Sequence, residues 1–273
     1  MNGPQRSLPV ATPKTTGFFT DTTVCIGCKA CEVACKQWNQ LPDDGLEFTG
    51  MSYDNTGALG AATWRHVAFV ERTIAGDDGS PGKPSWWMMS DVCKHCVRAG
   101  CLEACPTGSI IRTEVGSVYV QPDICNGCGY CVSACPFGVI DRIEEDGRAF
   151  KCTLCYDRQR EDLEPACAKA CPTDSIVFGE ITDLRVMAKK RLDALHARGV
   201  TDATLYGESA SAQPGTEGLH AIFLLVGEPE AYNLPPDPTV PTTPAKSSWL
   251  SAGVSAMALG ALALGAAFLG RRA

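Results

Sequence analysis

Sixteen cysteines fall into four tight groups that could bind metal centres. Two groups, CIGCKACEVAC from Cys25 and CNGCGYCVSAC from Cys125, have the spacing C-x2-C-x2-C-x3-C. This spacing holds 4Fe–4S clusters in bacterial ferredoxins, because a short loop can wrap a compact cluster and aim three thiolates at it. The groups are Cys25, Cys28, Cys31 and Cys35; Cys93, Cys96, Cys101 and Cys105; Cys125, Cys128, Cys131 and Cys135; and Cys152, Cys155, Cys167 and Cys171.

Disulfide bonds and zinc ions are the alternative uses of these cysteines. Disulfide frameworks are typical of short secreted chains, whereas clustered cysteines are better placed to grip one metal centre than to cross-link distant segments. Four zinc ions would also use sixteen thiolates, so counting cannot separate them from four iron–sulfur clusters. The triple run favours iron and sulfur, because zinc sites typically use separated C-x2-C pairs. A structural zinc protein is the alternative from a different class.

The ligands of each cluster follow from two-cluster ferredoxins, in which the fourth cysteine of a run binds the other cluster of the pair. Only 19 residues separate Cys105 from Cys125, so the second and third groups are predicted to pair, which leaves the first and fourth groups to pair with each other. We call the four predicted ligand sets sites 1 to 4. Site 1 is Cys25, Cys28, Cys31 and Cys171; site 2 is Cys152, Cys155, Cys167 and Cys35; site 3 is Cys93, Cys96, Cys101 and Cys135; site 4 is Cys125, Cys128, Cys131 and Cys105.

Short elements must position these loops. The fourth cysteine of a run is expected to begin a helix, and the prolines that follow three of them suit the first position of a helix or a turn, because proline has a preset φ and needs no N–H there. Residues 109–121 are predicted to form two short strands around a turn at Gly116. The insertion at 39–91 is predicted to contain a hairpin, from 64–72 and 85–91, with Trp86 and Trp87 in a small core.

Three further elements are predicted towards the C-terminal side. A hairpin at 143–151 turns at Asp146-Gly147. The segment 183–199 has the pattern of an amphipathic helix, and 220–227 reads as a buried strand. The helix is expected to place four apolar residues near one face and to stop at glycine: Leu184, Met187, Leu192, Leu195 and Gly199.

Charge and composition narrow the function. The chain has 273 residues and a formal net charge of −7, which argues against a general nucleic-acid binder, since that would need a basic face. No acid–base pair, nucleophile or nucleotide-binding loop is recognisable, so no catalytic residue is predicted. His95 is expected to pack beside a cluster or tune it, and nearby cations could do the same or be solvated surface charges. These cations are Lys29, Lys36, Lys94, Arg98, Lys151 and Lys169.

The runs CIGCKACEVACKQWN, DVCKHCVRAGCLEACPTGSIIRTEVGSVYVQPDICNGCGYCVSACPFGVIDR and GRAFKCTLCYDRQ resemble the iron–sulfur β subunit of membrane-bound formate dehydrogenase. That family belongs to the four-cluster subunits of molybdopterin oxidoreductases. The resemblance covers roughly residues 17–245 and implies an α+β fold of two ferredoxin-like halves with four 4Fe–4S clusters. One departure is Lys36, which stands after Cys35 where the other runs have proline.

The resemblance also implies partners and a role. A catalytic α subunit with molybdenum or tungsten on a pterin would deliver electrons from formate, and a cytochrome b γ subunit that reduces quinone would accept them. The chain would then be the relay between them, without a catalytic site of its own. The alternative keeps this role and changes the partner enzyme, because relatives serve dimethyl sulfoxide, polysulfide, nitrite or hydrogen metabolism.

The predicted organisation divides the chain into four parts. A flexible N-terminus at 1–16 precedes a four-cluster domain at 17–232, and a Pro-rich linker at 233–246 leads to a transmembrane helix at 247–270. Within the cluster domain, the outer cluster pair comes from 17–40 and 150–180 and the inner pair from 90–142.

The predicted transmembrane helix rests on 24 residues without a charged side chain, which would rise roughly 36 Å as a helix, enough to cross a bilayer core. Trp249 suits an interfacial anchor, and small residues would let a membrane subunit approach closely. Arg271-Arg272 beyond the span predict a cytoplasmic C-terminus and a cluster domain on the outer face of the cell membrane. The N-terminus does not read as a signal peptide, and the resemblance implies export together with the α subunit.

Overall fold

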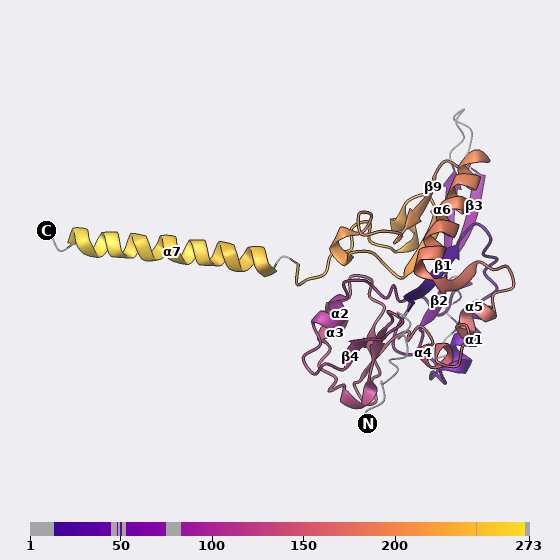
Figure 1. Ribbon diagram of the computed structural model, residues 1–273, viewed down its shortest axis with the longest axis horizontal. Helices are drawn as coiled ribbons and strands as arrows, with labels where there is room; N and C mark the ends of the chain where they lie inside the picture. The colour runs from indigo at the N-terminus through magenta and orange to yellow at the C-terminus, as the bar shows by residue number, and fades with distance from the viewer. Residues whose placement is uncertain are drawn as a thin grey trace, which may run out of the picture.

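The computed structural model describes residues 14–44, 48, 50, 53–74, 83–243 and 245–270. The described part mixes α and β elements: a four-stranded sheet, three two-stranded sheets and mostly short helices (Figure 1). Most of the predicted flexible N-terminus, residues 1–13, lies outside the described residues, and strand β1 already begins at Thr16.

The four-stranded sheet joins the two ends of the cluster domain. Its order is β8-β1-β10-β9, with β1 and β10 parallel and the other neighbours antiparallel. All six residues of β10 are buried, which confirms the predicted buried strand and fits a central strand covered on both faces. The strands are β1 Thr16–Asp21, β8 Ile176–Glu180, β9 Ala203–Tyr206 and β10 Ala221–Val226.

Helix α6, Ile181–Ala197, packs along this sheet and confirms the predicted amphipathic helix. Leu184 and Leu195 are buried in the shared core, and Leu192 is partly buried there. The sequence pattern predicts Met187 on the same face, but this residue is exposed, because the helix turns its side chain away from the sheet.

Strands β2, Arg65–Ile74, and β3, Lys83–Val92, pair antiparallel over ten residue pairs and confirm the predicted hairpin. The predicted turn of this hairpin lies largely at 75–82, outside the described residues. The expectation that both tryptophans are buried is wrong for Trp86, which is 45% exposed and stacks edge-on against Tyr53, while Trp87 is partly buried against the core.

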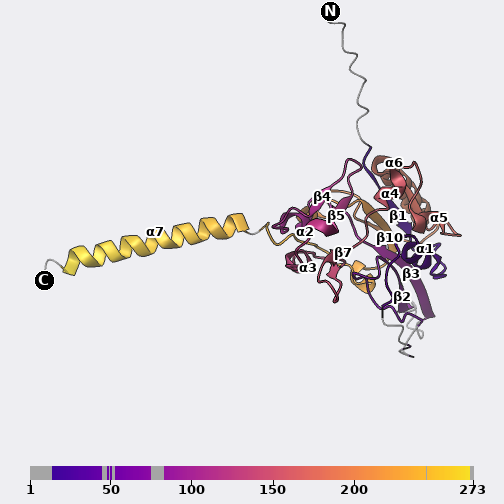
Figure 2. The same cartoon turned by 90° about the horizontal axis from the view of Figure 1, so that it is seen from below.

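Residues 93–150 form a separate small unit, which we call the inner lobe. Both predicted hairpins in this region are confirmed, since β4 pairs with β5 around Gly116 and β6 pairs with β7 around Gly147. In both views the inner lobe lies on the side of the molecule from which the C-terminal helix α7, Ala245–Gly270, extends (Figures 1 and 2). Its elements are α2 Gly100–Glu103, β4 Ile110–Arg112, β5 Val118–Val120, η1 Pro122–Ile124, α3 Tyr130–Ser133, β6 Asp141–Arg142 and β7 Ala149–Phe150.

The outer part of the domain combines the four-stranded sheet, the β2–β3 hairpin and three helices. Helix α1 packs against α5, which brings the first and last cysteine groups of the chain together. The helices are α1 Ala30–Trp38, α4 Tyr156–Gln159 and α5 Ala166–Lys169.

The segment expected to be a Pro-rich linker packs on the folded body: Leu234 is buried in one core with Tyr232, and residues 240–243 contact the inner lobe. After the 3-10 helices η2, Pro214–Thr216, and η3, Pro229–Tyr232, the chain buries Val240 completely. Arg98 of the inner lobe donates hydrogen bonds to the hydroxyl groups of Thr242 and Thr243 at 3.1 and 3.0 Å.

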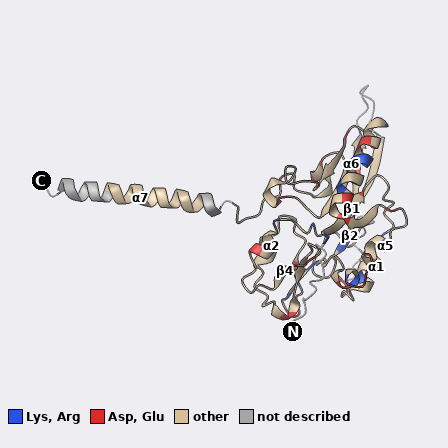
Figure 3. Cartoon of the chain, in the orientation of Figure 1, with Lys and Arg blue, Asp and Glu red and all other residues tan. Residues whose placement is uncertain are grey.

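The prediction of a transmembrane helix over 247–270 is wrong. These residues do lie in a helix, α7, Ala245–Gly270, which extends away from the body and has no charged residue along its described part (Figure 3). Among the residues that the structure describes, however, no helix combines the length and the apolar character that a membrane crossing needs. The predicted contact of 247–270 with a lipid bilayer is therefore not shown.

Candidate iron–sulfur sites

Site 1 lies in the loop before α1, in the first turn of α1, where Cys31 stands, and at the turn after α5. Its four cysteines line one cavity together with Ser90 and Ser175. Burial raises the pKa of Cys25, and the neighbouring thiolates of Cys171 and Cys28 add smaller effects in the same direction. Gly27 has φ of +65° in this loop, and a side chain there would collide with Phe69, so the tight wrap needs glycine.

Site 2 is the most buried of the four. Cys35 on α1 and the three cysteines from 152–167 are all buried. Burial first, then the thiolates of Cys152 and Cys167, raise the pKa of Cys35 well above its ordinary value. Cys155 precedes α4 in a left-handed conformation with φ of +47°, and Cys167 lies on α5 beside α1. The structure therefore brings Cys35 to the last cysteine group, 117 residues away in sequence.

Site 3 lies in the inner lobe close to the outer part of the domain. Its cysteines line one cavity together with Lys94, His95 and Lys151. Burial raises the pKa of Cys96 well above its ordinary value, and the thiolates of Cys93, Cys135 and Cys101 add to that shift.

Site 4 lies at the far side of the inner lobe. Burial raises the pKa of Cys131 to about 11, and the thiolates of Cys125, Cys105 and Cys128 contribute. Burial acts in the same direction on Cys105, but hydrogen bonds from Ser109, Thr107 and the backbone outweigh it and lower its pKa to about 7. Cys128 is exposed.

The helices of these sites differ from the prediction. The third cysteine of a group lies on a helix, as Cys101 does on α2 and Cys131 on α3. The fourth follows after the helix has ended in three groups, and in the first group it lies within α1, at Cys35. The expectation that the fourth cysteine begins a helix is therefore wrong. Pro106 and Pro136 stand in turns instead, because each chain must bend back at once towards the next strand or loop.

The candidate cations separate into buried and exposed residues. Lys94 and Lys151 are buried, and Lys151 donates a hydrogen bond to the carbonyl oxygen of Cys152 at 3.0 Å. The pKa of Lys151 is lowered by burial but raised overall by the thiolates of Cys93, Cys101 and Cys152. The others are partly or largely exposed, and three pair with carboxylates: Lys29 with Asp54, Lys36 with Asp44 and Arg98 with Glu103, while Lys169 is exposed.

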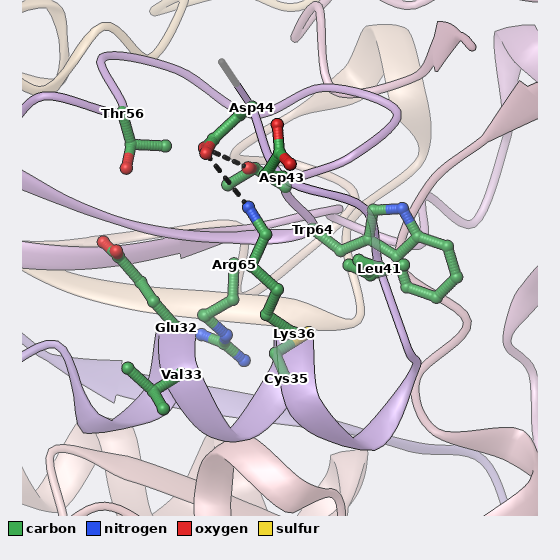
Figure 4. Close-up of a pocket in the computed structure, with 11 residues that line it drawn as sticks. Glu32, Val33, Cys35, Lys36, Leu41, Asp43, Asp44, Thr56, Trp64 and Arg65 are labelled. Carbon is green, nitrogen blue, oxygen red and sulfur yellow. Dashed lines mark hydrogen bonds and ion pairs between the residues drawn. The ribbon is translucent and has the colours of Figure 1, made fainter. Parts of the chain in front are cut away.

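Sequence reasoning missed Arg65, the first residue of β2. Its side chain is 1% exposed, and its Nη2 donates a hydrogen bond to the Sγ of Cys167 at 3.2 Å. Figure 4 shows it with Cys35 beside an open cavity in which Lys36 pairs with Asp44 at 3.2 Å. No sequence signal marks this residue, because it comes from the insertion and reaches the cysteines only through packing of the hairpin.

The chemistry of the four sets fits 4Fe–4S clusters. Closely grouped thiols, most of them buried or half-buried, do not ionise together unless a strong cation binds them, which is how iron holds thiolates. Two buried N–H groups, Nε of Arg65 and Nε2 of His95, also have no hydrogen-bond partner within the described residues. Nδ1 of His95 accepts a hydrogen bond from the amide of Val118, so neutral His95 carries its hydrogen on Nε2, which can donate to a sulfur in site 3.

Gly100 provides a first test of the inner lobe. A methyl group at this position would collide with the carbonyl oxygen of Ala134 at the end of α3. Gly100→Ala is therefore expected to push α2 from α3 and to destabilise the lobe by about 1–3 kcal/mol. Denaturant unfolding of the iron-loaded protein measures the change. Gly60→Ala is the matched control, because that methyl group would meet nothing within 4 Å; equal stability of the two variants would contradict the packing.

Comparison with known proteins agrees with this chemistry. Residues 24–109 and 84–181 each match a family described as "4Fe-4S dicluster domain". The chain is 40% identical over 249 residues to the formate dehydrogenase iron-sulfur subunit of Haemophilus influenzae, covering 89% of this chain and 76% of that protein. It is also 40% identical over 227 residues to the nitrate-inducible formate dehydrogenase iron-sulfur subunit of Escherichia coli, covering 82% and 73%. The B subunit of the Escherichia coli anaerobic dimethyl sulfoxide reductase is 33% identical over 174 residues, covering 62% and 75%.

The fold and the cysteine sites thus define an iron–sulfur protein with 4Fe–4S dicluster domains. The chain belongs to the family of formate dehydrogenase iron–sulfur subunits. It is an electron-transfer subunit, and the predicted role as a relay rather than an enzyme is confirmed by these relatives.

Proposed function

We propose that sites 1 to 4 each hold one 4Fe–4S cluster with the crossed ligand sets predicted from the sequence. The observation that carries this proposal is that Cys171 lines the cavity of Cys25, Cys28 and Cys31, and that Cys135 lines the cavity of Cys93, Cys96 and Cys101. The charge neighbours of the thiols agree with it. The strongest thiolate neighbours of Cys35 are Cys152 and Cys167, and those of Cys96 are Cys93 and Cys135. Cys171 acts on Cys25, and Cys105 acts on Cys131, so each fourth cysteine lies with the other group of its pair.

The sites are proposed to form a line in the order 1, 2, 3, 4. The thiolate of Cys167 in site 2 raises the pKa of Cys31 in site 1, after the larger effect of burial. Cys93 of site 3 acts in the same way on Cys152 of site 2, and Cys131 of site 4 acts on Cys101 of site 3. Bound clusters supply one-electron transfer, and this spacing of their ligands divides a long transfer into short steps.

The two ends of this line are proposed as the places where electrons enter and leave. Only two of the sixteen cysteines are exposed, and they stand at the two ends of the line: Cys28 in site 1 and Cys128 in site 4. The cysteines of the middle sites are buried or half-buried. Exposed apolar side chains stand next to them, Ile26 at 59% exposure and Tyr130 at 61%. A site that reaches the surface is accessible to another subunit, whereas a buried site is not.

The proposed donor is a catalytic α subunit that oxidises formate with molybdenum or tungsten on a pterin, and the proposed acceptor is a cytochrome b subunit that passes electrons to quinone. The names of the relatives support formate as the substrate of the partner enzyme. Contact with the cytochrome b subunit would hold the cluster domain at the cell membrane, on the outer face that the resemblance indicates. Residues 17–232 are proposed to be the four-cluster domain, with the outer pair in 17–40 and 150–180 and the inner pair in 90–142.

The test uses the complex purified anaerobically from its native host by a tag on this chain. Formate is expected to reduce the iron–sulfur centres, seen as paramagnetic signals, and dimethyl sulfoxide is expected to leave the reduced centres unchanged. Reoxidation by dimethyl sulfoxide would favour the other oxidoreductases as partner. A protein without iron would refute the cluster assignment and leave zinc as the alternative.

A further inference from the structure

Arg65 is a buried cation placed between site 1 and site 2. Its Nη1 donates to the carbonyl oxygen and to the Oγ of Ser90 at 3.2 and 3.3 Å, and its Nη2 donates to the Sγ of Cys167 at 3.2 Å. The guanidinium carbon lies 4.6 Å from the centre of the Phe18 ring, so one face of the group is packed against an aromatic side chain.

Ser90 extends this contact to the other site. It stands on β3, paired with Val67 in the hairpin, and its Oγ lies 3.2 Å from the Sγ of Cys31. Because Arg65 donates to the Ser90 oxygen, the hydroxyl hydrogen is free to point at Cys31. The two side chains therefore form one hydrogen-bonded unit that touches a thiolate of site 1 and a thiolate of site 2.

A guanidinium cannot be deprotonated in a protein, so its burial must be compensated by negative charge. Four thiolates, Cys167, Cys31, Cys152 and Cys35, are the charges that favour its protonated form. Reduction adds one negative charge to a site. A fixed cation and a hydrogen bond to the ligand sulfur stabilise that added charge, and so they raise the reduction potential.

We propose that Arg65 and Ser90 act as a positioning unit that raises the reduction potentials of sites 1 and 2 together. This inference rests on the proposed function, since it needs clusters bound at these two sites. Sites 3 and 4 lie on the inner lobe and are expected to be independent of it.

The experiment is a redox titration of the complex, followed by paramagnetic resonance, with iron and sulfide analysis of each variant. Arg65→Gln is expected to retain iron and to shift the midpoints of two of the four centres to more negative values. Arg65→Lys keeps the charge and should lie nearer to wild type, and Ser90→Ala should shift one centre by a smaller amount in the same direction. Arg72→Gln is the matched control: Arg72 lies on the same strand but donates to the carbonyl oxygen of Val226 at 2.6 Å.

If the midpoint potentials of all four centres are unchanged in an iron-replete Arg65→Gln protein, the inference is overturned and the relay function stays intact. If Arg65→Gln fails to retain iron, Ser90→Ala and Arg65→Lys decide, because unchanged midpoints in Ser90→Ala contradict a unit that reaches site 1. A shift of similar size in Arg72→Gln also overturns it. Absence of iron from the wild-type complex is a different outcome, since it refutes the proposed function itself.

Discussion

Removal of iron and sulfide is expected to unfold the inner lobe while the core beneath α6 stays folded. The inner-lobe core consists of eight buried residues, two of which are Cys101 and Cys131, and further cysteines pack around it. Its helices have four residues each and its strands two or three, too short to be stable without a binding partner. In small metal-binding units the free energy of metal binding becomes free energy of folding, so the lobe should depend on sites 3 and 4.

The core beneath α6 provides an internal control. It joins Phe19, Leu184 and Ile222 with five other buried residues, and no cysteine is among them. Hydrogen exchange before and after anaerobic treatment with an iron chelator measures both regions in one sample. Amides of 93–150 are expected to lose protection by roughly 100-fold or more, and amides of β10 and α6 by far less. Equal loss in both regions, or a protected inner lobe without iron, would contradict the expectation.

Much of the site could be predicted because cysteine spacing is a local property. A C-x2-C-x2-C run limits where three thiolates can point, whatever the rest of the chain does, and the short hairpins around Gly116 and Gly147 carry their own turn signals. The same reasoning failed where tertiary packing decides. Arg65 in the segment WRHVAFVER looks like a solvent-facing residue of an alternating strand, and only the packing of the hairpin against α1 and α5 turns it towards Cys167.

Two of the predictions that the structure corrects rest on local patterns. The membrane span at 247–270 follows from an uncharged run and its flanking residues, and the helical exit from each cluster loop follows from the ferredoxin pattern and the prolines. In the structure the helix precedes the fourth cysteine in three groups and contains it in the first, where Cys35 lies on α1. Local composition therefore identifies the ligands better than it identifies the elements that carry them.

Cys171→Ala is expected to remove the cluster of site 1 and to leave that of site 2. Cys171 follows α5, the helix that carries Cys167, so the two cysteines are four residues apart but belong to different predicted sites. Cys171 lines the cavity of Cys25, Cys28 and Cys31, whereas the thiolate charge that acts most strongly on Cys35 comes from Cys152 and Cys167. In an uncrossed arrangement, Cys171 would instead bind the same cluster as Cys152.

The measurement compares iron content and paramagnetic signals of the anaerobically isolated complex. Cys171→Ala should fall from about sixteen irons per chain to about twelve, if all four sites hold cubane clusters in the wild type. The same signal should disappear in Cys25→Ala, which removes a ligand of site 1, and a different signal in Cys155→Ala, which removes a ligand of site 2. A Cys171→Ala spectrum that matches Cys155→Ala would show that the last cysteine group closes on itself. In that case sites 1 and 2 would each take their ligands from one cysteine group. The two sites on the electron path would then not be linked by ligands exchanged between α1 and the region of α5, as they are in the crossed arrangement.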